Sequence, residues 1–369
     1  MSVFSLYGWE VSPYTAKVRA YLQYKKIPFK VVVPHILTLK RIIEPKVGKV
    51  IMPVIIGPEG EILQDSTVII DALEEKFSSN CIKPHTAKQR FVSQVMELCG
   101  DEWLPMAALH FRWNYPGNQD FILSEFGKSA LPYFPSILQR KVASTFAGKM
   151  KSYLPAMGVT GKMENALETN THKILNLLNR HFEHHPYLLG TKPCVGDFSM
   201  FGPIYAHLHR DPSPVNLVSN YPNTLGWLNR LNQCTTIQEG EFLNNDHVPD
   251  TLLDLISLII EQQFPLINDS IKAISNWTAE NKYKTTLPRK IGTTALQIED
   301  HRSERLNLTY PYWMFQKISD DYLSLSEKER NNVKRMVSES SKTASSHMGL
   351  LDRKLAHRVE LKRCRLHLI

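Results

Sequence analysis

Ser12 and Thr15 carry hydroxyl side chains at either end of a four-residue stretch that follows an apolar run closed by Gly8. Serine is a good helix N-cap, and Pro13 suits the first helical position after it. The first turn of such a helix presents free backbone N–H groups and a positive dipole end, which together stabilise a thiolate or another anion. Ser12 is therefore a candidate hydrogen-bond donor to an anionic sulfur. The same pattern is equally typical of a serine that only caps the helix.

Two further short motifs follow within the next fifty residues. Met52-Pro53 stands at the start of an apolar run, where proline cannot join a central ladder, and it is a candidate cis bond that exposes the Met52 backbone. Asp65 or Ser66 caps a predicted helix that continues to Phe77. The N–H groups at such a cap can bind a carboxylate.

The apolar pattern indicates the elements that position these motifs. Two strands flank one helix in a compact β-α-β unit, and a hairpin with a turn at 57–60 and a final helix follow it. The predicted ranges are 3–8 for the first strand, 16–24 for the helix, 29–33 for the second strand, and 51–56 with 62–63 for the hairpin.

This order resembles the thioredoxin-like domain of the glutathione transferase superfamily. The resemblance rests on Ser12-Pro13-Tyr14, Met52-Pro53-Val54 and Asp65-Ser66 and extends over about residues 1–235. It implies an α/β thioredoxin-like N-terminal domain followed by an all-α C-terminal domain. The domain ranges are 1–80 for the glutathione-binding domain, 86–236 for the all-helical domain, and 240–369 for an additional, mostly helical region.

The resemblance also implies roles for individual residues. Ser12 faces the glutathione sulfur, Met52 and Pro53 pair with the cysteinyl part, and Asp65 and Ser66 hold the γ-glutamyl end. Some members of the family use a tyrosine near the end of the first strand, so Tyr7 is a rival catalytic residue. Ser12 is preferred because Tyr7 lies before the loop.

The implied function is that of a glutathione transferase, a homodimer whose bound glutathione, as a thiolate, attacks a small electrophilic or hydrophobic substrate. Redox members of the thioredoxin-like group need cysteine at one or both ends of the first motif, and here Ser12 and Thr15 occupy those ends. Dithiol exchange through this motif is therefore excluded. The alternative is a non-catalytic scaffold or binding protein of the same fold, as in metaxin-like proteins. The retained Asp65-Ser66 motif favours the enzyme.

The composition of the chain limits the cellular compartment and the binding partners that can be expected. The chain has 369 residues, 43% hydrophobic and 22% charged, which is ordinary for a soluble globular protein. No signal peptide is recognised, and no apolar run is long enough to span a bilayer. Five scattered cysteines indicate neither a disulfide framework nor a zinc site. We therefore expect a cytoplasmic protein without a metal or a nucleic-acid partner; the cysteines are Cys81, Cys99, Cys194, Cys234 and Cys364.

The remainder of the chain carries four further predictions. The stretch 111–115, which is aromatic and basic, either lines a pocket between the domains or is a partly buried helix end. Asp197 accepts backbone N–H bonds near a helix start and is structural. Separate amphipathic helices are predicted at 248–264 and 267–277. The basic tail that contains Leu355 and Leu366 is expected to form a surface helix packed by its leucines, with contact to nucleic acid or a membrane as the alternative.

Overall fold

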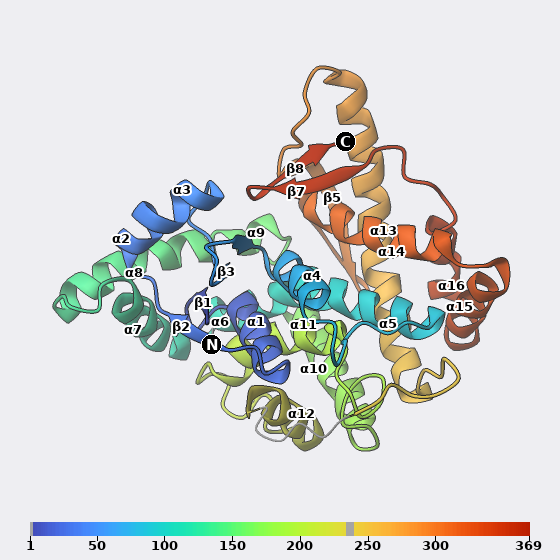
Figure 1. Cartoon of the computed structure of the whole chain (residues 1–369), viewed down its shortest axis with the longest axis horizontal. Coiled ribbons are helices and arrows are strands. Elements are labelled where there is room, and N and C mark those ends of the chain that lie inside the picture. The colour runs from blue at the N-terminus through green and yellow to red at the C-terminus, as the bar shows by residue number, and fades with distance from the viewer. Residues whose placement is uncertain (1–2, 234–239) are drawn as a thin grey trace. The chain divides into compact units, whose positions relative to one another are not determined.

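In the computed structural model, which describes residues 3–233 and 240–369, four short strands near the N-terminus form one sheet (Figure 1). Their order is β2-β1-β3-β4. β1 is parallel to β2 and antiparallel to β3, and β3 is antiparallel to β4. This topology confirms the predicted thioredoxin-like domain. The strands are β1 Phe4–Tyr7, β2 Phe29–Val32, β3 Val54–Ile56 and β4 Ile62–Gln64.

Helices α1 (Pro13–Tyr24) and α4 (Ser66–Lys76) pack against each other beside this sheet. The ring of Phe4, on β1, meets the ring of Phe77, which follows α4, at 6.1 Å. The Tyr21 hydroxyl of α1 donates to Glu74 Oε1 of α4 at 2.8 Å, and Lys25 Nζ lies 2.8 Å from the same oxygen. Apolar packing and a buried ion pair therefore fix the two helices relative to each other.

The described chain divides into two compact units. The first comprises residues 1–81, 104–154 and 198–239, and the second comprises 82–103, 155–197 and 240–369. The predicted boundary at residue 236 and Cys234 lie outside the described residues. The other elements of the first unit are α2 Ile36–Thr38, the π-helical η1 Leu39–Ile43, α3 Glu44–Val47, α6 Leu104–Asn114, the 3-10 helix η3 Pro116–Asn118, α7 Gln119–Ala130, α8 Ser136–Lys151, the π-helical η4 Ile204–His209 and α12 Pro222–Gln233. Two short helices cross the boundaries between the units, α9 Tyr153–Ala156 and α11 Val195–Pro203.

The second unit is built around one long helix, α13 (Asp250–Glu280), which contacts α10, β5, α14 and α16. Two separate helices are predicted here, whereas α13 continues through Pro265. Phe264 and Ile267 are both 1% exposed, so the buried stripe runs across the proline, and its burial outweighs the lost backbone bond. The unit's other elements are α5 Ala87–Leu98, the π-helical η2 Cys99–Trp103, α10 Lys162–Phe182, β5 Lys290–Ile298, β6 His301–Leu308, α14 Tyr310–Ser324, α15 Glu327–Ser340, α16 Lys342–His347, the 3-10 helix η5 Met348–Leu350, β7 Val359–Lys362 and β8 Arg365–Leu368.

The prediction of a basic surface helix at the C-terminus is wrong. The last residues form the antiparallel hairpin β7–β8, which turns through Arg363 and Cys364 with φ of 47° and 61°. Two consecutive positive φ values suit a tight hairpin turn that matches strand twist. Leu366 is still buried, at 5% exposure, but it packs from a strand.

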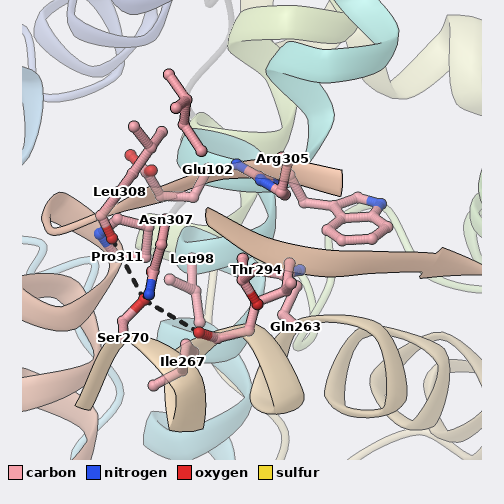
Figure 2. Close-up of a pocket in the computed structure, with 13 residues that line it drawn as sticks. Leu98, Glu102, Gln263, Ile267, Ser270, Thr294, Arg305, Asn307, Leu308 and Pro311 are labelled. Atoms are coloured by element: carbon pink, nitrogen blue, oxygen red, sulfur yellow. Dashed lines mark hydrogen bonds between the residues drawn. The ribbon is translucent and has the colours of Figure 1, made fainter. Parts of the chain in front are cut away.

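A small cavity lies between α13 and the β5–β6 hairpin of the second unit (Figure 2). Its volume is about 30 Å³, which accommodates about two water molecules. Ser270 Oγ donates to Asn307 Oδ1 at 2.6 Å. The cavity is too small for an organic substrate.

The described residues contain neither a membrane-spanning helix nor a cluster that could hold a metal ion. No helix within 3–233 or 240–369 is long and apolar enough to cross a bilayer. The same ranges contain no cluster of histidine, cysteine, aspartate and glutamate able to hold a metal ion. The cysteines among them, Cys81, Cys99, Cys194 and Cys364, are free thiols.

Candidate functional site

The sheet register brings three sequence motifs to one edge of the first unit. Val54 begins β3 and lies opposite Tyr7, the last residue of β1, and opposite Gln64, the last residue of β4. The loop after Tyr7, the Met52-Pro53 bond before Val54, and the cap after Gln64 therefore all emerge at the same end of the sheet. The bond between Met52 and Pro53 is cis, as expected.

Ser12 is the N-cap of α1. Its backbone is extended, with φ of −88° and ψ of 123°, and its Oγ accepts a hydrogen bond from the Thr15 amide at 3.3 Å. Gly8 brings the preceding loop close to this turn, since a Cβ at Gly8 would lie 2.4 Å from Thr15 Cγ2. Because Oγ acts as the acceptor in the cap, the Ser12 hydroxyl hydrogen can be donated to a group beyond the helix end.

Asp65 is the N-cap of α4 and has an unusual backbone. Its Oδ1 accepts from the amides of Thr67 at 3.0 Å and Val68 at 3.3 Å. Its φ of 83° is rarely adopted by a residue with a side chain and costs about 1–3 kcal/mol. Ser66, the first residue of α4, is 5% exposed, and its amide and hydroxyl take no part in the bonds to Asp65. The cap thus positions one hydroxyl and one amide of Ser66 at a positive helix end.

A buried lysine connects the first turns of these two helices. Lys17, on α1, is 1% exposed, and its Nζ donates to Thr67 Oγ1 of α4 at 3.3 Å. The contact lies one residue after Ser66 and five after Ser12. It therefore helps to keep the two helix N-termini together.

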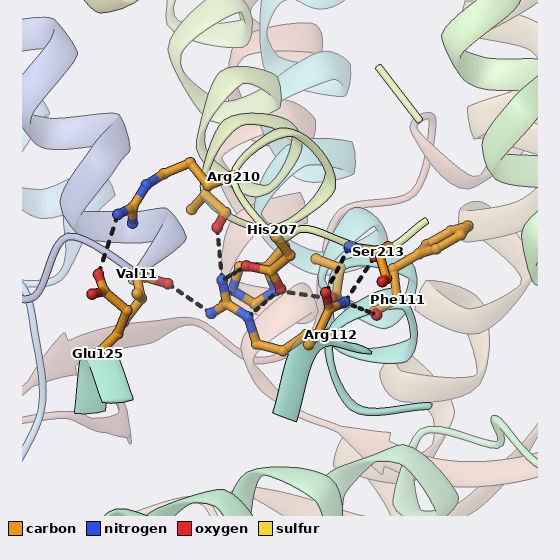
Figure 3. A network of polar contacts seen from close by, with 11 residues as sticks. Val11, Phe111, Arg112, Glu125, His207, Arg210 and Ser213 are labelled. Atoms are coloured by element: carbon orange, nitrogen blue, oxygen red, sulfur yellow. Dashed lines mark hydrogen bonds and ion pairs between the residues drawn. The ribbon is translucent and has the colours of Figure 1, made fainter. Parts of the chain in front are cut away.

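A buried arginine holds the residue directly before Ser12 (Figure 3). Arg112, on α6, donates from Nη1 to the Val11 carbonyl at 2.9 Å. Its Nε and Nη2 form two parallel bonds of 2.7 Å to Asp211, the strongest geometry for such a pair. Nη2 also donates to the Ala206 carbonyl at 2.7 Å, and Nη1 lies 2.7 Å from His207 Nε2. Arg112 thus ties the Ser12 loop to α6 and to the chain that follows α11.

The electrostatics of this network follow from its burial. Burial lowers the pKa of Arg112 and raises the pKa of Asp211, while their mutual attraction opposes both shifts and keeps the pair charged. Burial, then the Arg112 charge, lower the pKa of His207 well below its usual value. His207 is therefore neutral: Nε2 accepts from Arg112, and Nδ1 donates to the Ala108 carbonyl at 2.8 Å.

The other predicted residues take more peripheral places. Tyr7 alternates with Phe4 and Leu6 along β1, so its side chain projects from the sheet face opposite to the one that Phe4 presents to Phe77. Asp197 is structural, as predicted: it is fully buried and accepts from the amides of Cys194 at 2.9 Å and Leu188 at 3.1 Å.

The Arg112 network could not be recognised from the sequence. Residues 111–115 form the partly buried end of α6, which is the second of the two predictions, and Arg112 there is 2% exposed and ion-paired. Its partner Asp211 is 99 residues away along the chain. A single arginine within an aromatic stretch gives no local signal for such a contact.

Comparison with protein families matches residues 6–81 to the glutathione S-transferase N-terminal domain and residues 139–234 to the glutathione S-transferase C-terminal domain. No curated protein sequence matches the chain.

Solved structures that match part of the chain include a beta-etherase, LigF, from Sphingobium sp. strain SYK-6 (19% identity, 62% of this chain and 94% of that one, TM-score 0.43). Another is the tau class glutathione S-transferase of mango, Mangifera indica (15% identity, 63% and 89%, TM-score 0.39). A third is a glutathione S-transferase of Methylobacillus flagellatus with glutathione bound (15% identity, 61% and 93%, TM-score 0.36).

Proposed function

The chain belongs to the glutathione transferase superfamily, and we propose that it binds glutathione at the sheet edge described above and activates its thiol. The observation that carries this proposal is the pairing of Val54 with both Tyr7 and Gln64, which places the three motifs at one edge. Two helix N-termini meet there, and glutathione is an anion with a carboxylate at each end and a thiol between them.

Each part of glutathione has a matching group in the proposed site. The Ser66 amide and hydroxyl, at the positive end of α4, bind the γ-glutamyl carboxylate. The Asp65 carboxylate attracts the γ-glutamyl ammonium group. The Met52 backbone, two residues before the start of β3, pairs with the cysteinyl peptide group. This arrangement directs the sulfur toward the N-terminus of α1.

Ser12 is the proposed activating residue. A free thiol has a pKa of about 8.5, and lowering it by one to two units requires roughly 1.4–2.7 kcal/mol. A hydrogen bond to a charged group contributes about 1.5–3 kcal/mol, and the α1 dipole adds to it. Ser12 can therefore keep the sulfur as a thiolate near neutral pH. The thiolate then forms a bond to an electrophilic carbon of a small substrate as the leaving group departs.

Titration of glutathione into the protein tests this binding site. We expect Asp65→Ala and Ser66→Ala each to weaken binding by about 1–3 kcal/mol, the cost of one lost charge-assisted hydrogen bond. Ser326→Ala is a matched control, because Ser326 caps α15 in the other unit. It should leave the affinity unchanged. Parent-like affinity in both Asp65→Ala and Ser66→Ala would refute the assignment.

A two-fold homodimer in the cytoplasm completes the proposal. Two-fold symmetry is by far the commonest among soluble oligomers, and the resemblance to glutathione transferases implies it here. The free thiols of Cys81, Cys99, Cys194 and Cys364 support a reducing compartment. Light scattering at micromolar concentration should give twice the chain mass of 42.4 kDa. A monomeric mass would contradict the dimer without affecting the glutathione site.

A further inference from the structure

An unusual apolar surface lies where the chain turns from α7 to α8. The seven residues 132–138 are all exposed. Four of them are large and apolar: Tyr133 is 92% exposed, Phe134 51%, Ile137 84% and Leu138 39%. Solitary exposed apolar residues are normal, but such a contiguous group marks an interaction site.

This hairpin tip, residues 131–138, is held in a defined conformation by its own hydrogen bonds. The Leu131 amide donates to the Gly127 carbonyl at 2.9 Å, and the Phe134 amide donates to the Leu131 carbonyl at 3.2 Å. Gln139 Nε2 donates to the same Leu131 carbonyl at 2.9 Å. α7 and α8 lie close together where they meet the tip, since a Cβ at Gly127 of α7 would lie 2.9 Å from the Gln139 carbonyl oxygen of α8. The tip therefore presents its apolar side chains outward from a fixed support.

The charge around the tip has one sign. Between Glu125 and Glu164 the sequence contains no aspartate or glutamate, but it contains six lysines and arginines. Five of these cations lie on α7 or α8 and are exposed: Lys128, Arg140, Lys141, Lys149 and Lys151. Of the five, Arg140 forms an ion pair of 2.5 Å with Asp120, at the start of α7. α8 itself buries only Ala143, so its cations are available to an external partner.

We propose that this hairpin tip docks on a bilayer that contains anionic lipids, an interaction independent of the proposed glutathione site. Tyr133, Phe134, Ile137 and Leu138 enter the interfacial region, where aromatic and aliphatic side chains partition favourably. The cations next to the tip, Lys128 and Lys141, meet the lipid phosphates, and each contributes about a fivefold increase in binding. A second copy of the chain is a poorer occupant, because a two-fold contact between tips would bring the cations together.

Sedimentation of the full-length protein with vesicles tests the proposal. We expect it to pellet with vesicles of phosphatidylcholine and phosphatidylglycerol, to remain largely in solution with phosphatidylcholine alone, and to be released by salt. Tyr133→Ser combined with Ile137→Ser should reduce binding about tenfold or more. Lys128→Gln combined with Lys141→Gln should reduce it about 25-fold, since each of these cations contributes about fivefold.

Tyr283→Ser is the matched control, because Tyr283 is 99% exposed in the other unit, and it should bind vesicles as the parent does. Thermal unfolding should be unchanged in all variants, since the replaced side chains are exposed. An absence of pelleting with anionic vesicles would overturn the proposal. A loss of vesicle binding in Tyr283→Ser as large as that in Tyr133→Ser/Ile137→Ser would also overturn the proposal. A change of oligomeric mass in Tyr133→Ser/Ile137→Ser, without vesicle binding by the parent, would instead assign the tip to a contact between copies.

Discussion

Ser12 and Asp65 use helix caps in two different ways. Ser12 accepts one amide bond through Oγ and keeps a hydrogen to donate, which suits a bound sulfur. One carboxylate oxygen of Asp65 accepts hydrogen bonds from two backbone amides. The φ of Asp65 is 83°, a conformation that the surrounding structure must enforce. Strained residues of this kind concentrate at ligand sites, and here the strain places Ser66 at the sheet edge.

The buried histidines make stability depend on pH. His181 is fully buried; its Nδ1 lies 2.8 Å from Thr251 Oγ1, its Nε2 lies 3.2 Å from the Tyr187 carbonyl, and burial lowers its pKa to about 4. The pKa of His207 is also lowered well below its usual value. Both take up protons more readily when unfolded. Their stabilisation is complete above the unfolded pKa of about 6.5 and decreases as pH falls below it.

We therefore predict that the free energy of unfolding falls between pH 6.5 and 4, by about 1.4 kcal/mol per pH unit for each histidine. Urea denaturation at pH 7.5, 6, 5 and 4.5 measures this dependence. His181→Gln should reduce the pH dependence of the free energy of unfolding by the contribution of one histidine. His184→Gln, which replaces an exposed neighbour, should leave it unchanged. A slope that His181→Gln leaves unaltered would show that another group titrates.

At the scale of elements, the site depends on α1 and α4 being held together at their N-termini. Lys17 joins them near the caps, and Glu74 joins them near their C-terminal ends through Tyr21 and Lys25. α11 also approaches closely, since a Cβ at Gly202 would lie 2.6 Å from the Pro13 carbonyl oxygen. These contacts fix the helix ends independently of any ligand.

Removal of Arg112 should be costly because it leaves a buried carboxylate without a partner. We predict that Arg112→Met lowers the free energy of unfolding by about 3–5 kcal/mol. Arg112→Met combined with Asp211→Leu should recover much of that loss, since no charge then remains buried. The exposed pair Arg180–Asp254, at 3.1 Å, provides the control, and Arg180→Met should cost less than about 1 kcal/mol.

Urea denaturation of these variants measures the predicted differences in the free energy of unfolding. A cost for Arg112→Met no larger than that for Arg180→Met would mean that the network does not stabilise the fold. Arg112 also positions the loop before Ser12 through the Val11 carbonyl. The double variant should therefore regain stability but not the full thiol activation of the parent.

Strands β1 to β4 and helices α1 and α4 could be predicted because their apolar patterns are local, whereas the helical segments between residues 36 and 47 were not predicted. The β5–β6 hairpin could not be predicted, because β6 turns Arg305 and Asn307 inward, at 6% and 4% exposure, where a strand normally carries apolar residues. The β7–β8 turn uses Arg363 and Cys364 at positive φ instead of the usual glycine or asparagine. The motifs at the site could be predicted individually, but their shared edge depends on β3, whose register only long-range pairing determines.

At the scale of the whole molecule, the C-terminal region is part of a shared core. α13 packs against α5 and α10, which lie within the helical segment predicted at 86–236. It buries twelve of its residues, among them Leu255, Ile259 and Phe264. The region after residue 240 therefore covers apolar surface that the preceding helices cannot bury alone.

We predict that a chain ending at residue 239 does not reach a stable native state. Its exposed apolar surface should cause aggregation or strong binding of a hydrophobic dye, with no cooperative thermal transition. Size-exclusion chromatography and calorimetry, with the full chain as the control, measure these properties. A monodisperse fragment with a sharp unfolding transition would contradict the shared core.

The most direct test of thiol activation is the ultraviolet absorbance of the glutathione thiolate, titrated against pH in the bound state. In the parent protein the pKa of the bound thiol should lie one to two units below its usual value of about 8.5. Ser12→Ala should raise that pKa and slow conjugation by roughly 10- to 100-fold, with glutathione affinity nearly intact. Ser12→Cys should instead form a mixed disulfide with glutathione. An unshifted pKa in the parent would favour the non-catalytic scaffold, and a parent-like Ser12→Ala beside an inactive Tyr7→Phe would assign the role to Tyr7.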